Sequence, residues 1–233
     1  MQIDVEGDTI ACLTLALRLR LKRHDVCVIS DDHVVDIAED FTLPAPYRDL
    51  FLKTGDALET VLPLAEVPPL AHIDRRHPLM QEAAAIWSAV RVGNYRSRRT
   101  IAAALRGHDA TTREAVLSYV SAHGLDADRI GDAALVLPYL DLTFGRWRFE
   151  AGMPALSNEL RARCARIGVT FAAAQRGAQD IGAADIDAEL RTMLSVQRRW
   201  RADIIAPHEL GSRLGLPFIG MAAETIADRF GRA

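Results

Sequence analysis

The sequence predicts an α/β fold that begins with a parallel βαβ unit and contains a reduced, mostly helical second region. The first observation is a short strand, an apolar-periodic helix and an apolar strand in that order within residues 1–30. The second is a stretch at 78–137 with helical periodicity and no strand pattern. The third is a return to alternating helix and strand patterns from residue 139 onward.

The βαβ unit opens with a short strand that Gly7 ends. Asp8 or Thr9 can cap the next helix, because such side chains accept hydrogen bonds from the free N–H groups of a first turn. Apolar residues recur at helical spacing over 10–23, and its basic residues suit an exposed C-terminal end. Residues 26–29 are continuously apolar, which is typical of a parallel strand buried on both faces. The basic residues of the helix are Arg18, Arg20, Lys22 and Arg23.

These patterns divide the chain into three stretches. Residues 1–76 hold the βαβ unit and a Pro-rich segment, and residues 77–138 form the helical region. Residues 139–233 return to the first domain and end in a helix, with a strand expected at 143–149. Residues 177–187 are the best candidate for a loop or linker.

Composition is that of an ordinary globular protein. Of 233 residues, 49% are hydrophobic and 25% are charged, and a net charge of −3 gives no reason to expect nucleic acid as a partner. No apolar run reaches membrane-spanning length and no signal peptide is visible, so we expect a cytoplasmic protein without a membrane span. The three scattered cysteines predict buried free thiols. Because the cysteines are scattered and the histidines are well separated, we expect no metal site.

The residues after the first strand match part of a dinucleotide-binding pattern. Such a unit has glycines as G-x-G-x-x-G and an acidic residue at the end of its second strand. Gly7 holds the first glycine position, whereas Thr9 and Cys12 hold the second and third. Ser30 stands where the acid is expected, and Asp31 follows it. The pattern is therefore incomplete, and an ordinary βαβ unit without a nucleotide is the alternative interpretation.

Asp8 adds a carboxylate beside the N-terminus of the first helix. That position favours the helix dipole but opposes a bound phosphate. Loss of two polar cofactor contacts, at about 1–1.5 kcal/mol each, lowers affinity by roughly one to two orders of magnitude. We therefore expect any dinucleotide to bind weakly at this turn.

Four further segments resemble the phytoene desaturases and related bacterial FAD oxidoreductases. The segment PAPYRDLFLKTGDALETVLPL (44–64) is similar to their Pro-rich turn, short helix and Gly-x-x-Leu. The segment 139–171 resembles their Tyr…Phe-Gly-x-Trp block, which continues into Gly-Gly-Met, a helix and a Gly-Val strand. RADIIAP (201–207) resembles a late strand of the fold, and 215–233 resembles the closing helix, whose N-terminus points at the flavin in that family.

The resemblance implies an FAD/NAD(P)-binding Rossmann-like domain with FAD as its cofactor. The chain departs from the family at several of its flavin contacts. No Gly-Gly-Arg segment follows the second strand, Ala151 replaces the first glycine of Gly-Gly-Met, and no Gly-Asp motif precedes the last helix. The residues that the resemblance assigns to the cofactor are Gly7, Thr9, Ile10, Ser30, Asp31, Gly220 and Met221.

The resemblance thus predicts a phytoene-dehydrogenase-related protein with a degraded dinucleotide site and weak or no flavin binding. If active, it is an FAD-dependent, desaturase-like oxidoreductase, although no catalytic residue or substrate follows from the sequence. The alternative is a pseudoenzyme that binds an unknown small molecule or a protein partner. A homodimer or heterodimer would cover apolar surface exposed by a shortened fold. NAD(P) in place of FAD ranks last, since Ser30 replaces the ribose-binding acid.

Overall fold

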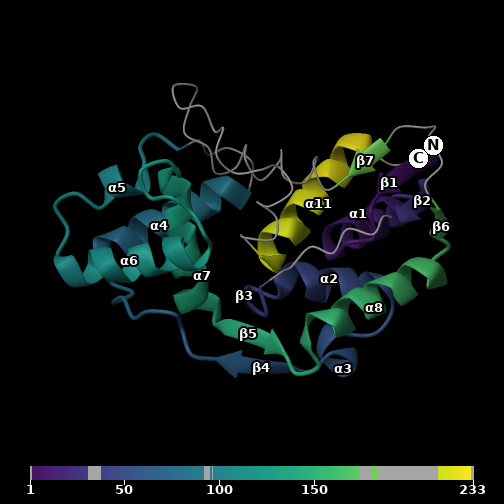
Figure 1. Ribbon diagram of the computed structural model, residues 1–233, viewed down its shortest axis with the longest axis horizontal. Coiled ribbons are helices and arrows are strands. Elements are labelled where there is room, and N and C mark those ends of the chain that lie inside the picture. The colour runs from purple at the N-terminus through teal and green to yellow at the C-terminus, as the bar shows by residue number, and fades with distance from the viewer. Residues whose placement is uncertain are drawn as a thin grey trace. The chain divides into compact units, whose positions relative to one another are not determined.

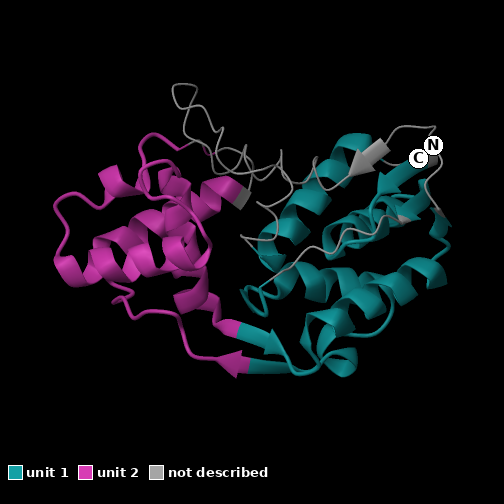
Figure 2. Cartoon of the chain, in the orientation of Figure 1, with its two compact units in different colours: residues 1–65, 147–190, 207–233 teal, residues 66–146, 191–206 magenta. Residues whose placement is uncertain are grey.

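The computed structural model describes residues 2–30, 38–91, 95, 97–173, 180–182 and 215–231. The chain divides into two compact units (Figure 2). Residues 1–65, 147–190 and 207–233 form the first unit, and residues 66–146 and 191–206 form the second.

The second unit is inserted into the sequence of the first. The chain leaves the first unit within β4 (Leu64–Val67) and re-enters it within β5 (Arg146–Phe149). The helical region expected at 77–138 lies within this insertion, which extends beyond that range at both ends.

The first unit contains a parallel sheet (Figure 1). The strand β1 (Gln2–Glu6) lies between β2 (Asp25–Ser30) and β7 (Asp180–Gly182), and β6 (Thr170–Ala173) pairs with the other edge of β2. Each of these pairings is parallel, and α1 (Ile10–Leu21) connects β1 to β2. The predicted α/β fold with an N-terminal βαβ unit is therefore confirmed.

The strand β7 falls within residues 177–187, so the prediction of a loop is wrong for Asp180–Gly182. These residues are too few to show a strand period in the sequence. They form a strand because they pair with β1, in the register Asp4 to Asp180. Such tertiary pairing overrides weak local propensity.

The middle of β1 is buried on both faces of the sheet. Ile3 and Val5 of β1 are fully buried, as is Val28, the register partner of Val5 in β2. Asp4, which lies between Ile3 and Val5 and so on the other face, is also buried, but its register partner Cys27 in β2 is only half-buried. The prediction that this strand is buried on both faces is therefore wrong at Cys27.

The helix α1 is buried nearly all round, because three helices pack against it. They are α2 (Ala45–Thr54), α8 (Gly152–Arg166) and α11 (Leu216–Phe230). Leu13, Leu15 and Leu17 are fully buried, which is the pattern of a helix enclosed by neighbours. Arg18 is buried too, at 5% exposure, so its predicted place on an exposed helix end is wrong.

A second sheet contains the two strands, β4 and β5, through which the chain leaves and re-enters the first unit. Its strand order is β3 (Asp40–Thr42), β5 and β4, and the helix α3 (Leu58–Val61) precedes β4. Phe41 and Phe149 stack with ring centroids 4.9 Å apart, and Arg148 Nε donates to Asp40 Oδ1 at 2.6 Å. β5 begins later than the strand expected at 143–149, because the preceding helix runs on until Gly145 ends it at φ 78°.

The second unit is helical in its described residues. The helices α4 (Pro78–Arg91), α6 (Ala110–Ala122) and α7 (Val136–Phe144) form most of it, with the short α5 (Ile101–Ala104) and η1 (Asp132–Leu135). Two side chains hold the loop before α4. Tyr119 Oη donates to Ala71 O at 3.0 Å, and Leu70 N donates to Asp141 Oδ2 at 3.1 Å.

These bonds tie residues 70 and 71 to α6 and α7, which accounts for the start of this unit before residue 77. Among the described helices of both units, none has the length and apolarity that crossing a membrane requires.

Candidate dinucleotide site

The turn from β1 to α1 keeps the backbone conformation that the first glycine of a dinucleotide motif provides. Gly7 has φ 95°, which a side chain rarely allows, and its N–H donates to Ile29 O of β2 at 2.8 Å. The turn thus ties the end of β1 to the end of β2 and directs the chain into α1. Gly7 is accounted for by this geometry with or without a cofactor.

Thr9 is the N-cap of α1, which confirms one of the two predicted caps. Its Oγ1 accepts a hydrogen bond from Cys12 N at 3.3 Å, and its carbonyl accepts one from Leu13 N at 2.9 Å. The first turn of a helix offers free N–H groups that can bind a phosphate. Here the side chain of Thr9 already takes one of them.

Cys12 fills the place where the third glycine of the motif allows helix and strand to approach. The thiol is buried, and its Sγ donates to Glu6 O at 3.1 Å. Thr9 Oγ1 in turn donates to this sulfur at 3.3 Å. The two side chains that replace the motif's glycines are therefore bonded to each other, and that of Cys12 is also bonded to the end of β1.

Asp8 forms an ion pair with Arg161 of α8. The guanidinium carbon of Arg161 also lies 4.7 Å from the ring centroid of Phe171 in β6, a cation–π arrangement. The side chains of Asp8 and Arg161 are 26% and 43% exposed, so solvent reaches the pair. A carboxylate at the start of α1 is thus held in place by a cation from another helix.

The remaining residues assigned near the turn are placed less fully. Ile10 is buried in the first turn of α1, where only its backbone could meet a cofactor. Ser30 is the last residue of β2, and Asp31 lies outside the described residues.

Gly220 and Met221 lie in α11, which runs in the same direction as α1. Arg18 pairs with Glu224 at 3.5 Å and, one turn further along each helix, Lys22 pairs with Asp228 at 2.6 Å. The N-termini of α1 and α11 therefore lie at the same end of the first unit. This is the arrangement that the resemblance implies for the final helix.

Gly220 itself faces α2. A β-carbon on Gly220 would lie 2.8 Å from Pro46 Cβ, closer than side chains tolerate, and 3.4 Å from Tyr47 Cε2. Met221, the next residue, is half-buried. A glycine at position 220 is therefore explained by the close approach of two helices, independently of any flavin.

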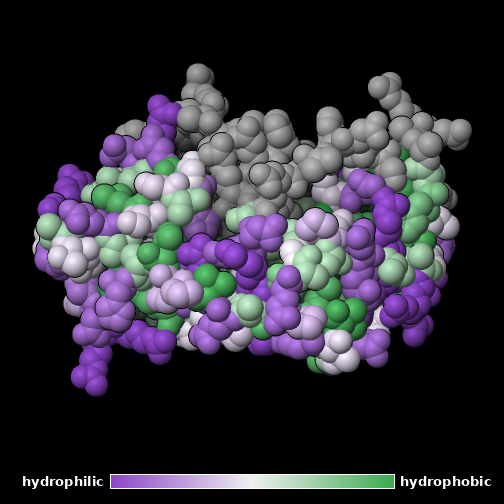
Figure 3. Space-filling model, turned by 60° about the horizontal axis from the view of Figure 1, so that its bottom comes forward, coloured by the Kyte–Doolittle hydropathy of each residue, from purple (hydrophilic) through white to green (hydrophobic). Residues whose placement is uncertain are grey.

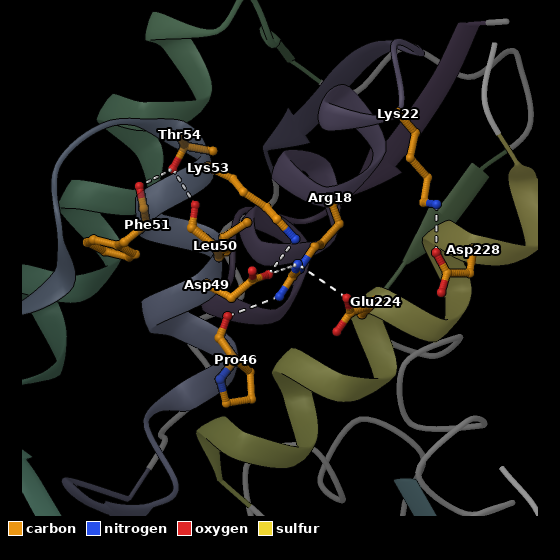
Figure 4. Close-up of polar contacts among 10 residues, drawn as sticks. All are labelled: Arg18, Lys22, Pro46, Asp49, Leu50, Phe51, Lys53, Thr54, Glu224 and Asp228. Carbon is orange, nitrogen blue, oxygen red and sulfur yellow. Dashed lines mark hydrogen bonds and ion pairs between the residues drawn. The ribbon is translucent and has the colours of Figure 1, made fainter. Parts of the chain in front are cut away.

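Arg18 is the polar centre of the contact among α1, α2 and α11, called here the three-helix contact (Figure 4). The sequence did not predict this role. Its guanidinium donates to Asp49 Oδ2 at 2.8 Å and to Pro46 O at 3.0 Å, both in α2, and reaches Glu224 of α11 at 3.5 Å. Although partial burial opposes the shift, hydrogen bonds from Lys53 and Arg18 hold the pKa of Asp49 below its usual value. The sequence feature that could have indicated this role is the position of a basic residue within the apolar period of α1.

Beside Arg18, Thr14 Oγ1 and Tyr47 Oη lie 3.3 Å apart in the same contact. Burial raises the pKa of Tyr47, and the bond to Thr14 and the charge of Arg18 only partly offset it. In the described part of the chain, no group of three or more His, Cys, Asp or Glu side chains is placed to hold a metal ion. Among the described residues, the candidate site is thus built from hydrogen bonds and ion pairs.

Comparison with known proteins gives similarity to solved structures alone. No protein-family model matches the sequence, and no curated protein sequence matches it. An oxidoreductase from Methanosarcina mazei is 13% identical, with a TM-score of 0.47 over 74% of this chain and 51% of that one. A Pyrococcus furiosus protein is 13% identical, with a TM-score of 0.45 over the same shares.

A putrescine oxidase is also 13% identical, with a TM-score of 0.42 over 73% of this chain and 51% of that one. The chain spans about half the length of these solved proteins. The similar structures thus include an oxidoreductase and a putrescine oxidase.

Proposed function

We propose that this chain is a phytoene-dehydrogenase-related protein of the FAD-dependent oxidoreductase type whose dinucleotide site is degraded, so that it binds FAD weakly or not at all. The observation that carries this proposal is the first turn of α1. There Thr9 and Cys12 replace two glycines and bond to each other, and Cys12 Sγ also donates to Glu6 O. A pyrophosphate would have to displace bonds that the chain already makes.

The three-helix contact supports the same proposal. Arg18, the close approach of Gly220 to Pro46 and the Thr14–Tyr47 contact fix α1, α2 and α11 against one another. None of these contacts needs a cofactor to complete it. The unit can therefore keep the architecture of a flavin domain after its flavin contacts have been lost.

The visible spectrum of the purified protein, followed by titration with FAD, tests this proposal. We expect colourless protein and no saturable quenching of flavin fluorescence below ~100 µM FAD, an affinity weaker than about −5.5 kcal/mol. Purified protein that is yellow with stoichiometric FAD would contradict the proposal. A Thr9→Gly, Cys12→Gly variant provides the comparison, because it restores both motif glycines.

The alternative is a non-catalytic module that binds an unidentified small molecule or a protein partner. Polar and apolar residues are interspersed on the face drawn in Figure 3. The large apolar side chains that are exposed among the described residues are Leu21, Leu52, Leu70, Leu117 and Phe144.

Two measurements distinguish the forms of this alternative. Light scattering after gel filtration would report a homodimer as twice the 25.6 kDa chain mass. A thermal-shift panel of nucleotides would report a small ligand, because a ligand that binds only the native state raises the melting temperature. A monomer whose melting temperature no nucleotide changes would count against both forms.

A further inference from the structure

The charge at the β1–α1 turn deepens the proposed function, on which the following inference rests. We propose that the Asp8 carboxylate, held by Arg161, is an internal anion that takes the place of a nucleotide phosphate at the N-terminus of α1. The contact acts as a built-in competitor. It occupies the guanidinium that would otherwise attract a phosphate, in addition to the loss of the motif glycines.

The turn before α1 lies at the positive end of the helix dipole. The N-terminus of a helix attracts one anion, because its free N–H groups and dipole point outward there. Asp8 directly precedes the N-cap Thr9, and its carboxylate is paired with Arg161. A phosphate approaching the first turn would compete with this carboxylate for the guanidinium.

Asp8 has Arg161 as its partner. Arg161 comes from α8, far from Asp8 in sequence, and it both pairs with Asp8 and stacks over Phe171. These two contacts hold the guanidinium beside the turn. Arginine is well suited to bind phosphate and carboxylate alike. In this pair, the Asp8 carboxylate therefore takes the part that the phosphate plays in an arginine–phosphate contact.

The turn is also mismatched to FAD. A cofactor pyrophosphate brings its own negative charge and needs close backbone approach. The turn instead presents Asp8, the Thr9 side chain and the Cys12 sulfur. The residues present do not fit the group that the family resemblance implies, and Asp8 contributes the electrostatic part of that mismatch.

Calorimetric titration with ADP at low salt tests the inference, because ADP carries the pyrophosphate without the flavin. Each variant is compared both in the natural chain and in the Thr9→Gly, Cys12→Gly background, where steric exclusion is relieved. We expect Asp8→Asn to raise ADP affinity at least tenfold in that background. Arg161→Gln added to Asp8→Asn should remove most of the gain, since the freed guanidinium would otherwise bind the phosphate.

A matched control comes from the other end of the sheet. Asp25 at the start of β2 pairs with Arg20 at 3.2 Å and lies away from the α1 N-terminus. Asp25→Asn removes the same charge and should leave ADP affinity within twofold. Circular dichroism and melting curves would establish that each variant is folded.

The inference is overturned if Asp8→Asn binds ADP no better than its parent in the glycine background, or if neither protein there binds ADP at all. A gain shared equally by Asp25→Asn would also overturn it, because net charge alone would then be the cause. Failure of the proposed function is seen separately. The natural chain would bind FAD stoichiometrically, whatever the ratio between the Asp8 variants.

Discussion

The α-carbon of Gly220 in α11 lies so close to Pro46 of α2 that an added β-carbon would be 2.8 Å from Pro46 Cβ. Glycine costs about 0.5–1 kcal/mol in a helix interior, so it needs a compensating reason. Here the reason is the approach of two backbones. The same residue was assigned to the flavin by resemblance, and the two roles give different predictions.

The packing role predicts that Gly220→Ala lowers the free energy of unfolding by about 1–2 kcal/mol. Helix propensity favours alanine by about 0.8–1 kcal/mol, but overlap with Pro46 costs about 1–3 kcal/mol and should decide the sign. Urea unfolding followed by circular dichroism measures the change. In a Pro46→Gly background the overlap is gone, and the alanine should then be neutral or stabilising. Stabilisation by alanine in the natural background would refute the packing role.

Arg163 predicts a larger loss of stability. It is fully buried in α8 and donates to Phe51 O at 2.8 Å, Thr54 Oγ1 at 3.1 Å and Asp56 O at 3.1 Å. It also pairs with Glu159 at 2.8 Å, and its guanidinium carbon lies 3.9 Å from the Phe51 ring centroid. Arg163 thus satisfies the acceptors at the C-terminal end of α2.

We expect Arg163→Met to lower the free energy of unfolding by about 3 kcal/mol, because it leaves buried acceptors and a partly buried carboxylate without a donor. Glu159→Gln is the matched comparison. It keeps every bond of Arg163 to α2 and weakens only the ion pair, so a loss of about 1 kcal/mol is expected. Equal losses in urea unfolding for the two variants would show that the α2 contacts contribute little.

The parts of the fold that the sequence predicted are those governed by local patterns. The βαβ unit follows from the apolar period of α1, the cap at Thr9 and the apolar run of β2. These features depend on neighbours within a few residues. The segment at β7 shows no such pattern, so its strand could not be predicted before its pairing with β1 was known.

The candidate site was predictable in position but not in content. The sequence places Gly7, Thr9 and Cys12 at one turn, and the structure agrees. The partner of Asp8 could not be predicted, because Arg161 is 153 positions away in sequence. The burial of Arg18 depends on acceptors in α2 and α11 for the same reason. A sequence pattern shows that a charge exists but not which distant group neutralises it.

His123 predicts a stability loss at mildly acidic pH. Burial lowers the pKa of His123 below its usual value and nearby Arg146 lowers it further, while the Tyr119 carbonyl, 2.7 Å from Nδ1, and Asp141 oppose this. The unfolded chain, with a histidine pKa of about 6.5, therefore takes up the proton first as the pH falls. As the pH falls, the free energy of unfolding should decline between about pH 6.5 and the lower pKa of His123 in the folded protein. Above about pH 6.5, this histidine should leave stability unchanged.

Urea unfolding of the natural chain and of His123→Asn at pH 7.5 and pH 5.5 tests this linkage. Asparagine can donate to the Tyr119 carbonyl but does not titrate. The natural chain should lose more stability between the two pH values than the variant does. Equal losses would assign the acid sensitivity between these two pH values to groups other than His123.

The three thiols predict a fixed order of alkylation in the native protein. None of the three is in a disulfide, but Cys27 is half-buried whereas Cys12 and Cys164 are buried. Burial raises the pKa of Cys164 to about 12, although Arg161 acts weakly against this, so the reactive thiolate is scarce at pH 8. Iodoacetamide should therefore modify Cys27 first, as measured by peptide mass spectrometry, and the other two only in urea. Cys164 Sγ of α8 donates to Leu13 O of α1 at 3.6 Å. Modification of Cys164 as fast as Cys27 would therefore mean that α8 separates readily from α1.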